Sequence, residues 1–239
     1  YAMFWEAKAF NQYVGSWDTS KVTTMRYLFI AAHKFNNGET TNEGNAPLNW
    51  NTSSVTNMSQ MFRCYDFNQY IGNWDTSNVT NMNAMFYTAY DFNNGQTNNE
   101  GTAPLNWNTS KVTDMMNMFY NARAFNQDIK TKTVTRDDGT TYTAWNTSKV
   151  TRMNQMFHEA RSFNQNIGDW NMLDVTNILS IIAGTGFNPT TYSNFLISLA
   201  NNDSLLDKDN LNVGITGLVR LDNEDTNDAY NFLTKSIEQ

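Results

Sequence analysis

The feature that most constrains this chain is an internal repeat of about 25 residues. Six of the seven Trp residues are followed by the next Phe-Asn after 17 or 18 residues. From Phe-Asn to the next Trp the spacing is 7, 15, 7, 15, 20 and 7 residues. One part of the unit therefore has a fixed length while the other takes insertions, which is typical of loops that leave one edge of a stacked repeat. The repeated residues are Phe10, Phe35, Phe67, Phe92, Phe125, Phe163 and Phe187, and Trp17, Trp50, Trp74, Trp107, Trp145 and Trp170.

The fixed part of the unit reads Trp-Asp/Asn-Thr-Ser-x-Val-Thr-x-Met-x-x-Met-Phe-x-x-Ala. In one unit Val79, Met82 and Phe86 recur at the spacing that predicts the apolar stripe of a short amphipathic helix. Thr80 precedes the stripe, so we expect its hydroxyl to cap that helix. The stretch 71–76 predicts a short strand that pairs in parallel with its neighbours.

The fold class that these elements predict is α/β. We expect a leucine-rich-repeat-like, right-handed solenoid of six to seven units over residues 1–188, closed by a C-terminal α/β cap over residues 189–239. Within the cap, residues 189–201 predict a helix with Tyr192, Phe195 and Leu199 on one face. Strands within 211–221 and a helix over 225–237 are expected to complete it. The chain begins within a unit, so we expect it to be a fragment or a processed product.

Two recurrent residue types are interpreted as structural. The Asn that follows each Phe suits an internal amide ladder, because an amide can both donate to and accept from buried turn groups. The Met stripe recurs at the packing period, which favours core positions over a soft-metal site. Its members are Met25, Met58, Met82, Met115 and Met153.

Outward columns are the candidate contact surface. If Trp17 and Thr19 point inward, strand alternation turns Asp18 and Ser20 outward. Such small polar groups either bond to turns and neighbouring units or form a polar strip for a ligand. The residue after the Ser varies from unit to unit, as a partner interface on a repeat protein does. The candidate partner-contact residues are Lys21, Ser54, Asn78, Lys111, Lys149, Asp174, Asp18 and Asp75. The insertions at 37–49, 94–106 and 130–144 are expected to leave the same edge.

Composition argues against several classes of function. A net charge of −7 without a Lys/Arg cluster disfavours nucleic-acid binding, and no apolar run predicts membrane insertion. The single Cys64 predicts neither a disulfide nor a thiolate metal cage. His33 and His158 lie in units far apart, and no repeat supplies an acid–His–nucleophile set or paired carboxylates. We therefore expect no enzyme activity, no metal site and no cofactor.

The unit FNQ-x-I-x-x-W-D-T-S-x-V-T-x-M-x-x-M-F-x-x-A resembles the BspA-like surface-protein repeat, also called the DUF285 or mycoplasma-lipoprotein repeat. The resemblance covers residues 1–188. It implies a leucine-rich-repeat-like protein that is surface-exposed or secreted by cellular microbes, with relatives in large DNA viruses. Its members are mostly assigned adhesion or protein binding. The chain departs from the pattern in its insertions and in Ile178, Ile181 and Ile182, which replace the Met pair of the last unit.

Three functions are compatible with these patterns. The first is a non-enzymatic extracellular or cell-surface protein that binds a protein or a glycan, or associates with itself. The second is a passive structural role as a stalk, filament or virion-associated component. The third is ice binding through a flat Thr/Ser/Asn ladder, which Lys and Asp in the variable column disfavour.

Overall fold

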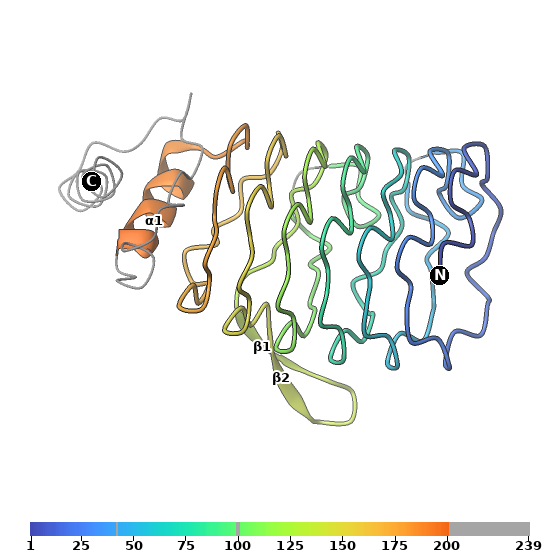
Figure 1. Ribbon diagram of the computed structural model, residues 1–239, viewed down its shortest axis with the longest axis horizontal. Coiled ribbons are helices and arrows are strands. Elements are labelled where there is room, and N and C mark those ends of the chain that lie inside the picture. The colour runs from blue at the N-terminus through green and yellow to red at the C-terminus, as the bar shows by residue number, and fades with distance from the viewer. Residues whose placement is uncertain (42, 99–100, 201–239) are drawn as a thin grey trace.

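The computed structural model describes residues 1–41, 43–98 and 101–200. Within them the regular elements are an antiparallel hairpin of β1 (Lys132–Thr135) and β2 (Thr141–Ala144), and the helix α1 (Pro189–Ala200). The other described residues form turns and irregular segments. Figure 1 shows the repeat units side by side in chain order along the long axis, with α1 beside the last unit. The fold is thus mostly irregular, and regularly spaced units organise its core.

The helix predicted in each unit is wrong. In the unit around residue 84, the backbone N–H of Ala84 donates to the carbonyl of Met116 in the next unit at 2.8 Å. The N–H of Thr88 donates to the carbonyl of Tyr120 at 2.8 Å. Between them, the N–H of Tyr87 closes a turn on the carbonyl of Ala84 at 3.2 Å. Ala84 and Thr88 have φ angles of +51° and +57°, so the chain runs through consecutive turns.

Stacking between units explains why turns replace the helix. A helix of two or three turns gains little stability alone, whereas the neighbouring unit accepts every second N–H of this segment. The apolar spacing could not separate the two conformations. Left-handed residues recur every four positions, at 84 and 88, and over about ten residues that period buries the same positions as the helical period of about 3.6.

The predicted strand and helix cap are wrong for the same reason. The N–H of Trp74 donates to the carbonyl of Ile71 at 3.2 Å, which closes a turn instead of extending a strand. Parallel pairing does occur, but as single bridges such as the one between Asn57 and Asn81. The hydroxyl of Thr80 caps no helix and donates to the carbonyl of Thr56 in the preceding unit at 3.2 Å. The predicted strand and helix in every unit are therefore absent from the described units.

Stacked aromatic rings form the core. Within a unit, two Phe rings lie face to face, as Phe86 and Phe92 do at a centroid distance of 3.9 Å. Each ring also stacks on its equivalent in the next unit, with Phe86 lying 5.3 Å from Phe119. The five Met side chains of the predicted stripe are buried among these rings, which confirms their core role. The Trp column runs parallel to the Phe columns, and Trp107 and Trp145 are fully buried.

The predicted amide ladder is confirmed. The N–H of Asn68 donates to the side-chain Oδ1 of Asn36 at 2.8 Å, and the N–H of Asn93 donates to the Oδ1 of Asn68 at 2.8 Å. The side-chain amide of Asn68 also donates to the carbonyl of Gln96 at 3.1 Å. The Asn68 side chain thus satisfies backbone groups of the next unit, whereas the amides of Asn36 and Asn93 donate to carbonyls of their own loops. The same bond from N–H to Oδ1 joins Asn11, Asn36, Asn68, Asn93, Asn126, Asn164 and Asn188 in series.

The helix α1 closes this end of the ring stack, and it begins where the ladder ends. Asn188 donates its N–H to Asn164 Oδ1, while its own Oδ1 accepts the N–H of Thr191 at 2.9 Å and caps α1. Tyr192, Phe195 and Leu199 are buried, so the predicted helix and its apolar face are confirmed. The strands and helix predicted within 211–237 lie outside the described residues. Among the described residues no helix is long and apolar enough to cross a membrane.

Cys64 gives a test of the stacked core. Its side chain is fully buried, and this burial raises the pKa of the thiol far above its usual range. We expect the native protein to react with a thiol reagent such as DTNB only as fast as it unfolds, since the reagent needs an accessible thiolate. Stopped-flow absorbance with and without urea would measure this. Stoichiometric reaction of the native protein within seconds would contradict the packing described.

Candidate binding cleft

The predicted contact columns lie on the surface, and local hydrogen bonds fix them. Asp75 accepts the N–H of Ser77 at 3.0 Å, and the same bond recurs at Asp18 with Ser20. The Thr between them is buried, and Thr76 donates its hydroxyl to the carbonyl of Asn108 in the next unit at 3.0 Å. These small polar groups therefore stabilise the turn, as their structural interpretation predicts.

The residues that follow the Ser of each unit form the variable column, and their side chains fall into two groups. Ser54 and Asn78 each donate from their side chains to a carbonyl of the preceding unit, at 3.0 and 2.8 Å. Lys111 extends this bridge, because its Nζ donates to Asn78 Oδ1 at 2.7 Å. By contrast, the exposed side chains of the other three candidates form no such bond within the described part of the chain: Lys21, Lys149 and Asp174.

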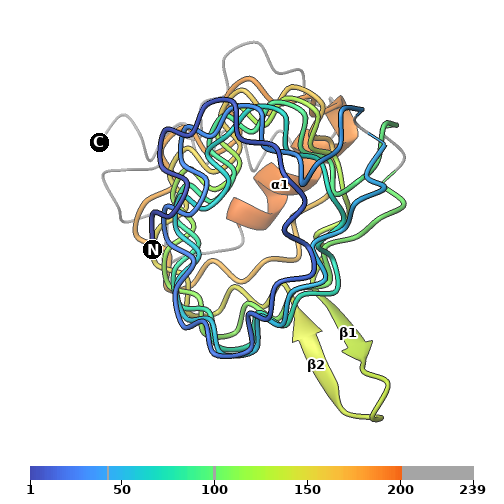
Figure 2. The ribbon, with the colours of Figure 1, turned by 90° about the vertical axis from the view of Figure 1, so that its right-hand side faces the viewer.

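The insertions leave the repeat from two positions. Figure 2 shows the loops of 37–49 and 94–106 close together, and the hairpin β1–β2 projecting on the same side from a separate corner. The two loops pack tightly, because a side chain at Gly44 would meet the backbone of Gly95 at 2.4 Å. A single edge was predicted for all three insertions. The hairpin departs because its insertion begins after Ile129, later in the unit than the other two.

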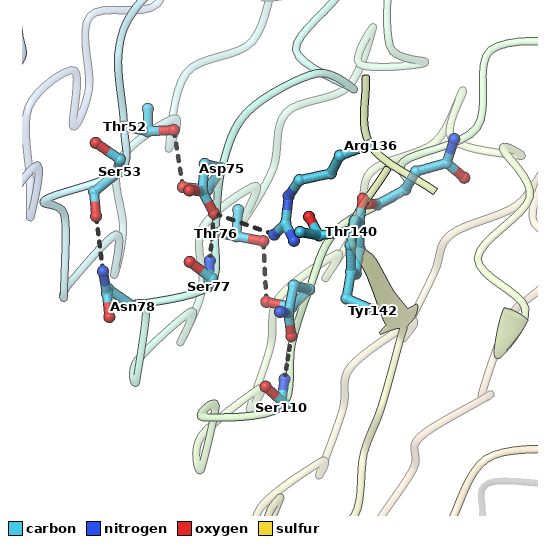
Figure 3. Close-up of polar contacts among 12 residues, drawn as sticks. Thr52, Ser53, Asp75, Thr76, Ser77, Asn78, Ser110, Arg136, Thr140 and Tyr142 are labelled. Atoms are coloured by element: carbon cyan, nitrogen blue, oxygen red, sulfur yellow. Dashed lines mark hydrogen bonds and ion pairs between the residues drawn. The ribbon is translucent and has the colours of Figure 1, made fainter. Parts of the chain in front are cut away.

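The hairpin forms one wall of a cleft of about 600 Å³. The opposite wall is the Trp-Asp-Thr turn of residues 74–76 with Asn106 and Asn108 of the next unit. Of the eight predicted contact residues, Asp75 is the one that lines this cleft (Figure 3). Arg136, the residue after β1, and Tyr142 on β2 face Asp75 from the hairpin. Tyr70, which is 38 % exposed, also lines the cleft.

Charge and ring contacts hold the hairpin against the turn. The guanidinium of Arg136 lies 4.0 Å from Asp75 Oδ1 and 4.3 Å from the ring centroid of Tyr142. The Tyr142 hydroxyl donates to the carbonyl of Asn106. Burial is the main cause that raises the pKa of Tyr142, and the neighbouring Asp75 adds to it, while Arg136 opposes it. Tyr142 therefore stays a neutral hydrogen-bonding ring at physiological pH.

The geometry of this cleft suits binding. It combines ring surfaces with a carboxylate, an amide and a guanidinium, the mixture that orients a small polar ligand. Among the described residues, no group of three or more His, Cys, Asp and Glu side chains could hold a metal ion. The two histidines are not brought together, since His33 stacks on Tyr65 and His158 on Tyr120.

Arg136 and Tyr142 were missed as site residues because they lie in an insertion that repeats nowhere else. The signal was present in the sequence. KTVT and TYTA alternate on either side of Asp-Asp-Gly, which predicts a hairpin. Gly139 has the positive φ of +81° that such a loop requires. A hairpin beside the outward column would have indicated the cleft.

Comparison with known families gives one assignment. The model of the family described as "Mycoplasma protein of unknown function, DUF285" matches residues 1–42, 38–143 and 138–206. Searches of curated proteins and of solved structures give no match. The matched ranges include every repeat unit and continue through α1. The chain belongs to the DUF285 family.

Proposed function

We propose that this protein is a non-enzymatic, solenoid-type repeat protein of the cell surface or extracellular space that binds a glycan in the cleft beside its hairpin. The leucine-rich-repeat-like solenoid is supported by the Asn ladder and the ring columns, because both join each unit only to its neighbours. The surface location is an expectation that rests on the repeat pattern.

The observation that carries the proposal is the composition of the cleft wall. Tyr70 and Tyr142 offer ring surface for the apolar C–H face of a sugar, and aromatic rings do this at little entropic cost. Asp75, Arg136 and Asn108 offer acceptors and donors for hydroxyl groups. A sugar needs both kinds of contact at once. In the part of the chain that the structure describes, Asp75 and Asn108 are the members of the Asp/Asn column that line this cleft.

The proposal predicts that Tyr142→Ala weakens glycan binding by about ten-fold, because the ring supplies one wall of the site. A glycan array with the intact chain would identify the ligand, and calorimetry would compare the variants. Asp75→Asn should also weaken binding. Asp18→Asn is the matched control, since it occupies the same turn position in the first unit, away from the hairpin.

Two results would contradict glycan binding at this site. If no glycan binds at micromolar concentration, a passive structural role as a stalk, filament or virion-associated component becomes the better account. If a glycan binds and Tyr142→Ala leaves its affinity unchanged, the site lies elsewhere on the surface.

Ice binding is a second candidate, and one observation favours it. Exposed Thr side chains recur once per unit, and each hydroxyl of the later units donates to the carbonyl of the preceding Thr. Such a column is regular, but the neighbouring column contains charged Lys111 and Lys149. Thermal hysteresis in a freezing-point assay would support this function, and its absence would exclude it. The column consists of Thr23, Thr56, Thr80, Thr113, Thr151 and Thr176.

A further inference from the structure

A second surface of stacked rings lies on the turn segments, away from the cleft. One column places His33 on Tyr65 at 4.0 Å and Tyr65 on Tyr90 at 4.7 Å, with the guanidinium of Arg123 4.3 Å from the Tyr90 ring. We call this surface, together with the adjacent column described next, the tyrosine–arginine face. It is built from the variable positions of the turn segment, so packing of the core does not require it.

The adjacent column runs in the opposite order. The guanidinium of Arg63 lies 4.6 Å from the ring of Tyr87, which stacks on Tyr120 at 4.6 Å. Tyr120 in turn stacks on His158 at 4.8 Å. The two columns thus carry an arginine at opposite ends of paired tyrosines. Stacking fixes the rings and the guanidinium planes before any partner arrives, which reduces the entropy lost on binding.

The two arginines have guanidinium N–H groups that bind no carboxylate of the described residues. Arg63 and Arg123 are exposed, and neither forms an ion pair with a carboxylate in the described part of the chain. Arg63 donates to the amide oxygen of Gln60 at 3.4 Å, and Arg123 donates to Asn121 Oδ1 at 2.9 Å. Three other cations of these turn segments already form ion pairs: Lys34 with Asp66, Arg152 with Asp114 and Arg161 with Glu159, at 2.9 to 3.1 Å.

We propose that the tyrosine–arginine face docks an extended acidic segment of a partner protein, with carboxylates that pair with Arg63 and Arg123 across the tyrosine rings. Tyrosine and arginine are the side chains that most often carry the binding energy of protein interfaces. A guanidinium fork binds a carboxylate in a two-bond geometry, and here the carboxylates must come from outside.

The charges around this face favour a peptide over a uniform polyanion. The carboxylates of these turn segments that form ion pairs are already paired with their own cations, and the chain as a whole has a net charge of −7. That net charge would repel a continuous row of phosphates or sulfates. A protein segment, by contrast, can carry carboxylates next to the two arginines and neutral residues elsewhere.

This surface is separate from the proposed glycan cleft. In Figure 2 the first residue lies on the side of the units opposite the hairpin. Residues 2–6 hydrogen-bond to residues 26–30 of the next turn segment, so the turn segments share that side. One molecule could therefore hold a glycan and a protein at the same time.

Peptide selection with the full chain tests the proposal. A random dodecamer phage library would be selected on the wild-type protein and counter-selected on the Arg63→Gln/Arg123→Gln variant. We expect the enriched peptides to carry at least two carboxylates, and synthetic copies to bind the variant about ten-fold more weakly. Replacing their Glu and Asp by Gln and Asn should have the same effect. Arg136→Gln is the matched control, because this arginine lies at the cleft.

Other outcomes would overturn the proposal. Enriched peptides without an acidic bias, or with equal affinity for the double variant, would show that the two arginines do not recruit carboxylates. Heparin or oligo-dT that binds the wild type more tightly than the best peptide would indicate a polyanion instead.

Both arginines are exposed, so urea unfolding should be the same for the variant and the wild type. Loss of glycan binding in Tyr142→Ala with peptide binding intact would separate the two sites.

Discussion

Replacing Asn68 by leucine is expected to lower the free energy of unfolding by roughly 3 to 6 kcal/mol, because two buried N–H groups and one part-buried carbonyl lose their partner together. The Oδ1 of Asn68 accepts the N–H of Asn93 at 2.8 Å and that of Gly95 at 2.9 Å. Its amide donates to the carbonyl of Gln96 at 3.1 Å. Leucine has the same branched shape and number of side-chain heavy atoms but replaces none of these bonds.

The chain contains a matched control for this substitution. Asn11 makes the corresponding bonds with Asn36, Gly38 and Glu39 in the first unit, but its side chain is only partly buried. Water can replace part of those bonds, so Asn11→Leu should cost about half as much or less. Asn73 is exposed, and Asn73→Ala should change the free energy of unfolding by less than about 0.5 kcal/mol.

Urea unfolding followed by both tryptophan fluorescence and circular dichroism would measure these differences. Two probes are needed because stacked repeats can unfold in parts. Equal losses at Asn11 and Asn68, or a loss below about 1 kcal/mol at Asn68, would mean that the ladder does not hold the units together.

The sequence predicted the side-chain columns well because their chemistry depends on recurrence alone. A Phe, Met or Asn that returns once per unit meets its own copy, whatever path the backbone takes between copies. Recurrence therefore predicted the buried Met stripe and the ladder in which the N–H of Asn93 donates to Asn68. It could not give the backbone itself. Every second N–H, as at Ala84, bonds to the next unit, and this depends on how closely the units stack.

The candidate site was harder to predict for a related reason. Asp75 was found because it belongs to a column, but the column alone does not form a cleft. The cleft needs Arg136 and Tyr142, which belong to an insertion found once in the chain. The arginines and tyrosines of the turn segments were overlooked for the opposite reason. They vary between units, so a search for recurrent residues passes over them, although variation at a fixed position is itself typical of an interface.

Replacing Trp107 by alanine is expected to cost roughly 3 to 5 kcal/mol of unfolding free energy, the range for deleting a fully buried large aromatic side chain. Its ring stacks 6.4 Å from Trp145 and lies 6.2 Å from Phe86, and its exposed fraction is 0 %. The indole Nε1 also donates to the carbonyl of Ile71 in the preceding unit at 3.1 Å.

Two further variants divide that loss into packing and hydrogen bonding. Trp107→Phe keeps a ring in the column but removes one of the two N–H donors to the Ile71 carbonyl, which retains the N–H of Trp74, so the lost bond and the smaller ring should together cost about 1 to 3 kcal/mol. Trp17→Ala is the positional control, since Trp17 is 42 % exposed at the first unit and stacks on Trp50 at 6.5 Å. Its loss should be less than about half of that at Trp107, because much of the ring already faces water. If instead the two alanine variants unfold at the same urea concentration, burial of a Trp within the column does not determine its contribution to stability. Local turns, and not the stacked rings, would then be the main source of the stability of the units.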